Sequence, residues 1–208
     1  LANTGGTLAT LGEWLYVENA DAGSIDRVIA DMTGAVAPTE AYFDVSATGT
    51  VLTGLDLPTA IEYREHVRLV LNLPATDDEV YVRGTALATE TEINTADGTH
   101  AIVVGSEASG SGGTVDAVDG LVVVNGEGTE HLLVDETGDT DTNVGFLTAT
   151  TLQGLGMADD DPGDGTDRVA GIEYHGIETL DVHLGEGSDN FRIEGTHGVT
   201  VTTVRTGG

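Results

Sequence analysis

Apolar and polar residues alternate along most of this 208-residue chain. Successive side chains of an extended strand point to opposite faces, so a period of two predicts strands with one buried face. β-branched residues dominate these stretches, and Gly, Asp, Thr and Ser fill the gaps between them, as is typical of strands joined by turns. The predicted strands are 67–73, 79–83, 100–106, 121–125, 131–135, 180–184, 190–194 and 199–204.

One segment has helical spacing instead. In SIDRVIADM (24–32), the side chains of Ile25, Val28 and Ile29 would share one face of a helix. Ser24 precedes them and could cap the first turn. We therefore expect a short helix here in an otherwise all-β protein.

The chain also repeats itself. Residues 61–85 align with residues 172–196 without a gap at an offset of 111, and both segments begin with Ile-Glu-Tyr and end with Gly-Thr. Two shorter matches set LYVENADAG (15–23) beside LLVDETGD (132–139), and LTGLDL (52–57) beside LQGLGM (152–157).

Two copies of a unit of roughly 110 residues explain these matches best. We expect repeat unit 1 to span 1–117, with a divergent stretch over its first 45 residues, and repeat unit 2 to span 118–208. The final VTVTTVRTGG ends where the next turn should begin, so we expect the second unit to be truncated within its motif.

The amino-acid composition is strongly acidic, and this limits the partners that the chain can bind. The formal net charge is −29, and all seven basic residues are arginine. Such a chain repels nucleic acid and anionic lipid, and it favours the solvated surface of a salt-adapted protein. We expect no nucleic-acid partner and no membrane insertion. Cysteine is absent, so disulfides and thiolate-ligated metals are excluded.

The succession LTATTLQGLGM, GIEYHGIETLDVHLGEGSDNFRIEGT and VTVTTV resembles the tandem β-strand repeats of very large bacterial or archaeal surface and secreted proteins, of the haemolysin-type calcium-binding or adhesin-like kind. The resemblance is good over about 120–208, degenerate over 50–125 and poor over the first 45 residues. It implies an extracellular, cell-surface β-solenoid array without catalysis of its own. Three of the four turns, PATDD, TADGTH and GEGTE, depart from the Gly- and Asp-rich pattern of that family's calcium turns.

The predicted fold is therefore all-β: a tandem-repeat, parallel β-helix-like solenoid, or alternatively two β-sandwich modules in tandem. In a solenoid, one row of apolar residues would face inward on each strand. These are Leu69, Leu71, Leu73, Val80, Val82, Leu180, Val182, Leu184, Phe191 and Ile193.

Calcium is the cofactor that the acidic loops suggest, because it is bound by carboxylate and carbonyl oxygens. The loop ADDDPGDGTD offers five carboxylates in one glycine-containing stretch, namely Asp159, Asp160, Asp161, Asp164 and Asp167. A second candidate is DETGDTD, with Asp135, Glu136, Asp139 and Asp141. Its aligned counterpart has fewer carboxylates, so this site would not occur in both copies.

Asp189 in LGEGSDNF is a third candidate. It resembles half of a calcium-binding nonapeptide, but the turn positions Asp78, His100, Glu130 and Asp189 lie 22, 30 and 59 residues apart rather than nine. Asp189 is therefore either a calcium ligand or a residue that hydrogen-bonds the turn backbone.

No motif for a catalytic nucleophile or a phosphate-binding loop is present, so we expect no catalytic residues and no enzyme activity. The predicted function is a structural or adhesive repeat segment of an extracellular filament or cell-surface protein, with neighbouring copies of itself as partners. The alternatives are a polysaccharide-acting β-helix enzyme, for which Arg64, Arg68, Arg83 and Arg192 could serve, and a glycan-binding module, which would need exposed aromatic residues. Tyr63 and Tyr174 occupy equivalent repeat positions, which favours packing.

Overall fold

The computed structural model describes residues 14–19, 24–108, 111–158 and 170–207, and these form seventeen strands and no helix. The all-β prediction is confirmed. No helix in the described part of the chain could serve as a membrane span.

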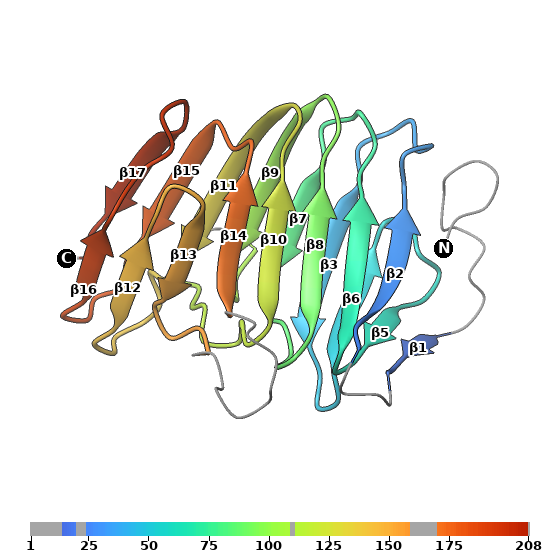
Figure 1. Ribbon diagram of the computed structural model, residues 1–208, viewed down its shortest axis with the longest axis horizontal. Helices are drawn as coiled ribbons and strands as arrows, with labels where there is room; N and C mark the ends of the chain where they lie inside the picture. Colours follow the sequence, from blue (N-terminus) through green and yellow to red (C-terminus); the bar gives the residue numbers. More distant parts are fainter. Residues whose placement is uncertain (1–13, 20–23, 109–110, 159–169, 208) are drawn as a thin grey trace.

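The strands form two mixed sheets that lie face to face (Figure 1). In spatial order, sheet A contains β1 (Leu15–Val17), β5 (Ile61–Tyr63), β4 (Thr50–Gly54), β3 (Glu40–Val45), β7 (Glu79–Val82), β9 (Thr99–Val104), β11 (Thr129–Asp135), β15 (Thr179–His183) and β17 (Val201–Arg205). Sheet B contains β16 (Asn190–Ile193), β12 (Val144–Leu147), β13 (Thr151–Gly154), β14 (Gly171–His175), β10 (Leu121–Asn125), β8 (Glu90–Asn94), β6 (Val67–Asn72) and β2 (Asp26–Asp31).

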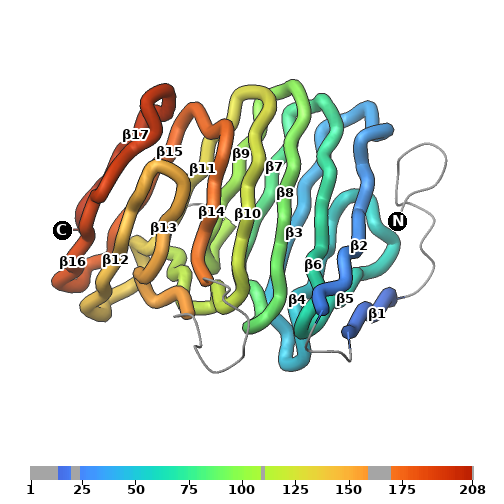
Figure 2. The backbone as a smooth tube through the Cα atoms, in the orientation of Figure 1, coloured from blue at the N-terminus to red at the C-terminus, as the bar shows by residue number. Residues whose placement is uncertain are grey.

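Successive strands alternate between the two sheets, as the path of the backbone tube shows (Figure 2). Every strand except β4 and β13 pairs in parallel with at least one strand from a neighbouring pass, for example β9 with β7 and β11. Two antiparallel meanders interrupt this alternation: β3–β4–β5 in sheet A and β12–β13–β14 in sheet B. Strands β1 and β2 lie at one end of the stack, and β16 and β17 lie at the other.

The predicted helix is wrong. Residues 26–31 form β2, which pairs in parallel with β6 from Asp26↔Val67 to Asp31↔Asn72. The pairing satisfies the backbone groups of β2 that face β6, and Ala30 is buried in the core. Tertiary pairing therefore overrides the helical spacing of the apolar residues in this segment.

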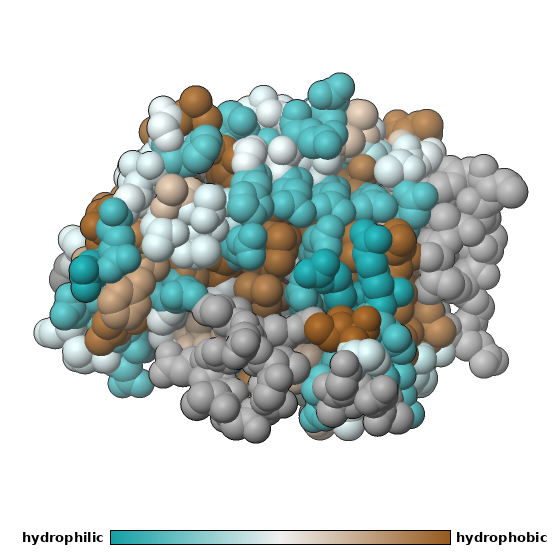
Figure 3. All heavy atoms as spheres, in the orientation of Figure 1, coloured by the Kyte–Doolittle hydropathy of each residue, from teal (hydrophilic) through white to brown (hydrophobic). Residues whose placement is uncertain are grey.

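Like residues stack in rows across the passes. Within sheet A, the registers place Val80, Ile102, Leu132 and Leu180 side by side, all fully buried. Burying such a side chain stabilises the fold by roughly 1.5–3 kcal/mol. On sheet B, the amide of Asn94 donates to Asn72 and accepts from the amide of Asn125. Hydrophilic side chains form a band across the outer face of this sheet (Figure 3).

Eight of the ten predicted inward residues are buried. The exceptions lie on β16, where Phe191 is partly buried and Ile193 is 54% exposed, so the prediction for Ile193 is wrong. Residue Val82, at the matching position of β7, is fully buried. β7 has a paired strand on each side, whereas β16 is the outermost strand of sheet B.

The succession of pairings from β1 to β8 recurs from β10 to β17, with the two sheets exchanged. In sheet A, the outer strands of the meander, β3 and β5, pair in parallel with β7 and β1. In sheet B, the outer strands β12 and β14 pair in parallel with β16 and β10. The offset of 111 is also the structural register, since the pair Arg68↔Glu90 recurs 111 residues later as Thr179↔Val201.

The match of 15–23 with 132–139 is wrong. The counterpart of β1 is β10, because Leu15 pairs with Ile61 and Val122 pairs with Ile172. The counterpart of 132–139 is 28–35, because Asp31 pairs with Asn72 and Asp135, 104 residues later, pairs with His183.

Candidate metal centre

Three carboxylates meet where β11 ends. Glu136 directly follows β11, Asp139 lies three residues further along the turn, and Asp116 comes from the connection between β9 and β10. One oxygen from each side chain lies within 4.8 Å of the other two. Hydrogen bonds between backbone groups hold the turn in place: the Glu136 N–H donates to the His183 carbonyl at 2.9 Å, and the Glu186 N–H donates to the Asp139 carbonyl at 2.8 Å.

The cluster is buried on one side and open on the other. Glu136 is 1% exposed and Asp139 is 7% exposed, whereas Asp116 is exposed. The Val115 N–H donates to Oε2 of Glu136 at 2.7 Å, but the buried Oε1 has no hydrogen-bond partner among the described residues. An unpaired buried carboxylate oxygen is costly and calls for an explanation.

Burial, together with the nearby carboxylates of Asp139 and Asp116, raises the pKa of Glu136 to about 9, and the bond from the Val115 N–H opposes this rise. The pKa of Asp139 is lowered, chiefly because the Asp141 N–H donates to its Oδ1 at 2.9 Å. Without a cation, Glu136 therefore holds the proton and Asp139 holds the negative charge at neutral pH.

The other members of the predicted turn have different surroundings. Asp135 is fully buried and satisfied: its Oδ1 accepts from the N–H and hydroxyl of Thr137, and its Oδ2 accepts from the Gly113 N–H at 2.9 Å. Asp141 is exposed and lies outside the cluster of three carboxylates. The five aspartates at 159–167 lie outside the described residues.

Asp189 contacts the backbone of a neighbouring turn. Its Oδ1 accepts from the Asn143 N–H at 3.0 Å, just as Oδ1 of Asp78 accepts from the Thr39 N–H at 2.8 Å in the first unit. Within the described ranges, no carboxylate cluster of metal-binding size contains Asp189.

Three of the predicted turn positions do stack on adjacent strands of sheet A. Asp78, His100 and Glu130 precede or begin β7, β9 and β11, and all three are buried. His100 Nδ1 lies 3.4 Å from Asp78 Oδ2, while Oε1 of Glu130 accepts from the Thr95 hydroxyl at 2.7 Å. Asp189 lies outside this row because it precedes β16 in sheet B.

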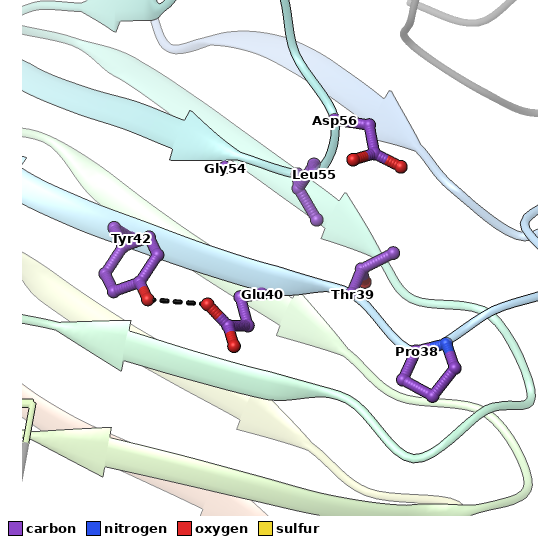
Figure 4. Close-up of a pocket in the computed structure, with 7 residues that line it drawn as sticks. All are labelled: Pro38, Thr39, Glu40, Tyr42, Gly54, Leu55 and Asp56. Atoms are coloured by element: carbon purple, nitrogen blue, oxygen red, sulfur yellow. Dashed lines mark hydrogen bonds between the residues drawn. The ribbon is translucent and has the colours of Figure 1, made fainter.

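A surface hollow lies beside β3 and β4 (Figure 4). Tyr42 lines it and stacks on Tyr81 with ring centroids 5.0 Å apart, and the Arg83 guanidinium lies over the Tyr42 ring. The two tyrosine hydroxyls donate to Glu40 and Glu79, so both polar ends are already satisfied. The lining residues are Pro38, Thr39, Glu40, Tyr42, Gly54, Leu55 and Asp56.

Tyr63 and Tyr174 are buried, which confirms their predicted packing role. The four arginines named for an enzymatic role are each held by carboxylates. Arg64 pairs with Glu62 and Glu18, Arg68 with Glu90 and Glu92, Arg83 with Asp44, and Arg192 with Glu194.

The sequence pointed to Glu136 and Asp139 through the DETGD turn but gave no sign of Asp116. Asp116 lies twenty residues earlier in the chain, in a connection without periodic pattern, and only the fold brings it to the turn. Protein-family models, curated proteins and solved structures gave no match to this chain.

Proposed function

We propose that this chain is a structural repeat segment of a β-solenoid array, exposed at a cell surface or in an extracellular filament, with neighbouring copies of itself as partners. The observation that supports it is the recurrence of β1–β8 as β10–β17 with the sheets exchanged. Each unit therefore begins in the opposite sheet from its predecessor, and stacking can continue in one direction without closing.

The junction in the middle of the chain suggests how neighbouring copies meet. There, β8 of the first unit pairs in parallel with β10 of the second. β17 is the counterpart of β8, β1 is the counterpart of β10, and both lie at the ends of sheet A. β1 of one copy can therefore extend sheet A of the preceding copy beyond β17. Edge strands that have no partner among the described residues on one side are natural templates for pairing.

The charge and the ion pairs favour this role over the alternatives. A polyanionic sugar would meet the repulsion of 29 excess negative charges, and the candidate arginines are engaged with carboxylates. The extracellular location and the adhesive role rest on the resemblance alone.

Sedimentation in molar KCl tests the proposal, because high salt screens the repulsion between copies. We expect an open series of linear oligomers that grows with protein concentration. Val201→Lys, on the outermost strand β17 at a side chain that is 65% exposed, should keep the protein monomeric. Leu87→Lys is the matched control, since Leu87 is 51% exposed in the connection between β7 and β8. A wild-type protein that stays monomeric at every concentration would refute self-stacking.

A further inference from the structure

The carboxylates at the end of β11 can be compared with the matching turn of the first unit. Asp31 and Asp135 occupy equivalent positions, and each accepts from a threonine two residues later. The Thr33 N–H and hydroxyl lie 3.1 and 2.7 Å from Oδ1 of Asp31, and those of Thr137 lie 3.2 and 2.7 Å from Oδ1 of Asp135. The two turns therefore share their local hydrogen bonds.

The next part of the turn also has the same backbone bond but different side chains. The Ala35 N–H donates to the Met32 carbonyl at 2.8 Å, and the Asp139 N–H donates to the Glu136 carbonyl at 3.0 Å. Met32 is buried at 2% exposure, and Glu136 is buried at 1%. The first unit thus builds this turn with methionine and alanine, so the fold of the turn does not require carboxylates.

The second unit places two acids where the first has apolar side chains, and it adds Asp116 beside them. When both are ionised, Glu136 and Asp139 are two acceptors without a donor between them, and Oε1 of Glu136 has no hydrogen-bond partner among the described residues. When Glu136 is protonated, its carboxyl group hydrogen-bonds Asp139. Only a proton or a cation can relieve that arrangement.

We propose that Asp116, Glu136 and Asp139 bind one hard divalent cation, calcium in the first instance. The three side chains provide only oxygen donors and no nitrogen or sulfur, which suits calcium rather than zinc or copper. Three carboxylates supply three to six of the six to eight oxygens that calcium needs, and water can reach the exposed Asp116 side to complete the shell.

Such a site would tie three parts of the chain together. Asp116 belongs to the connection between β9 and β10, while Glu136 and Asp139 are hydrogen-bonded to the chain around the end of β15. This inference deepens the proposed function, because a bound cation would stiffen the second unit. It is tested separately, since ion binding by a monomer does not depend on association.

The experiment is calorimetric titration of chelator-treated protein with calcium chloride in 2 M KCl, with thermal unfolding on the same samples. The key variant is Glu136→Met/Asp139→Ala, which copies the side chains of the first turn. We expect it to fold without calcium and to bind one ion fewer than wild type, while the calcium-induced rise in its unfolding temperature is lost. Asp97→Asn/Glu127→Gln removes two exposed carboxylates from other turns and should bind as wild type does.

Two results would overturn the proposal: no saturable binding by wild type up to about 10 mM calcium, a range that covers known extracellular calcium sites, or unchanged binding by the double variant. If that variant does not fold, Glu136→Gln/Asp139→Asn removes the same charges with little change of shape. If that variant binds as many calcium ions as wild type does, the proposal is overturned as well.

Discussion

At the scale of the residue, Glu136 couples the binding of a cation to the release of a proton. Its pKa rises from an ordinary value of 4.5 to about 9, so between these values the folded protein holds a proton that the unfolded chain has lost. Without a cation, the contribution of Glu136 to stability therefore falls as the pH rises through this window. Burial is the main cause of the raised pKa; the Val115 N–H opposes it, and the neighbouring acids Asp139 and Asp116 add to it.

Calcium should displace that proton. At pH 7 we expect about one proton to be released per bound ion, and at pH 10 almost none, because Glu136 is then already ionised. Titrations in two buffers of different ionisation enthalpy measure the number released. Equal heats in the two buffers at pH 7 would show that Glu136 carries no proton for calcium to displace.

Asp189 should behave as a turn residue. Asp189→Ala removes the acceptor of the Asn143 N–H, and we expect a loss of about 0.5–1.5 kcal/mol in the free energy of unfolding. Its calcium stoichiometry should equal that of wild type. Denaturant unfolding measures the first quantity and calorimetry the second, and one ion fewer in the variant would make Asp189 a ligand.

At the scale of the element, the two units share a left-handed turn after the middle strand of each meander. Gly54 and Leu55 have φ values of 84° and 56°, and Gly154 and Leu155 have 78° and 58°. A Cβ on Gly54 would lie 2.2 Å from the Glu40 carbonyl oxygen, and one on Gly154 would lie 2.0 Å from that of Val144. Backbone conformation and space both require glycine at these two positions.

Alanine at either glycine should destabilise the protein. A positive φ at a non-glycine residue costs about 1–3 kcal/mol in the free energy of unfolding. We expect Gly54→Ala and Gly154→Ala each to cost more than this, because the clash with the carbonyl oxygen adds to it. Gly112 has a φ of 86° with nothing within 4 Å of an added Cβ, so Gly112→Ala isolates the cost of φ alone. Equal losses for all three variants, measured in denaturant, would show that the carbonyl contacts relax.

At the scale of the whole molecule, the charge of −29 opposes both folding and association. The Debye length falls from about 10 Å at 0.1 M salt to about 3 Å at 1 M, so exposed carboxylates repel one another less in concentrated salt. We expect the unfolding temperature to rise steadily with KCl. The further rise caused by calcium should persist in 2 M KCl, because a buried site is screened weakly. Calcium stabilisation that vanishes in KCl would indicate a general counterion effect instead.

The sequence determined the eight strands with clear alternation, among them β6, β9 and β11, because alternation of apolar and polar residues is a local consequence of burying one face. It also determined the register of the clearest repeat, where 61–85 and 172–196 keep one offset in both sequence and structure. Tertiary structure decided what depends on distant neighbours: β2 became a strand because β6 lies beside it, and the sheets exchanged between units. It also brought Asp116 to Glu136, since residues twenty positions apart meet only when the chain passes back beside itself.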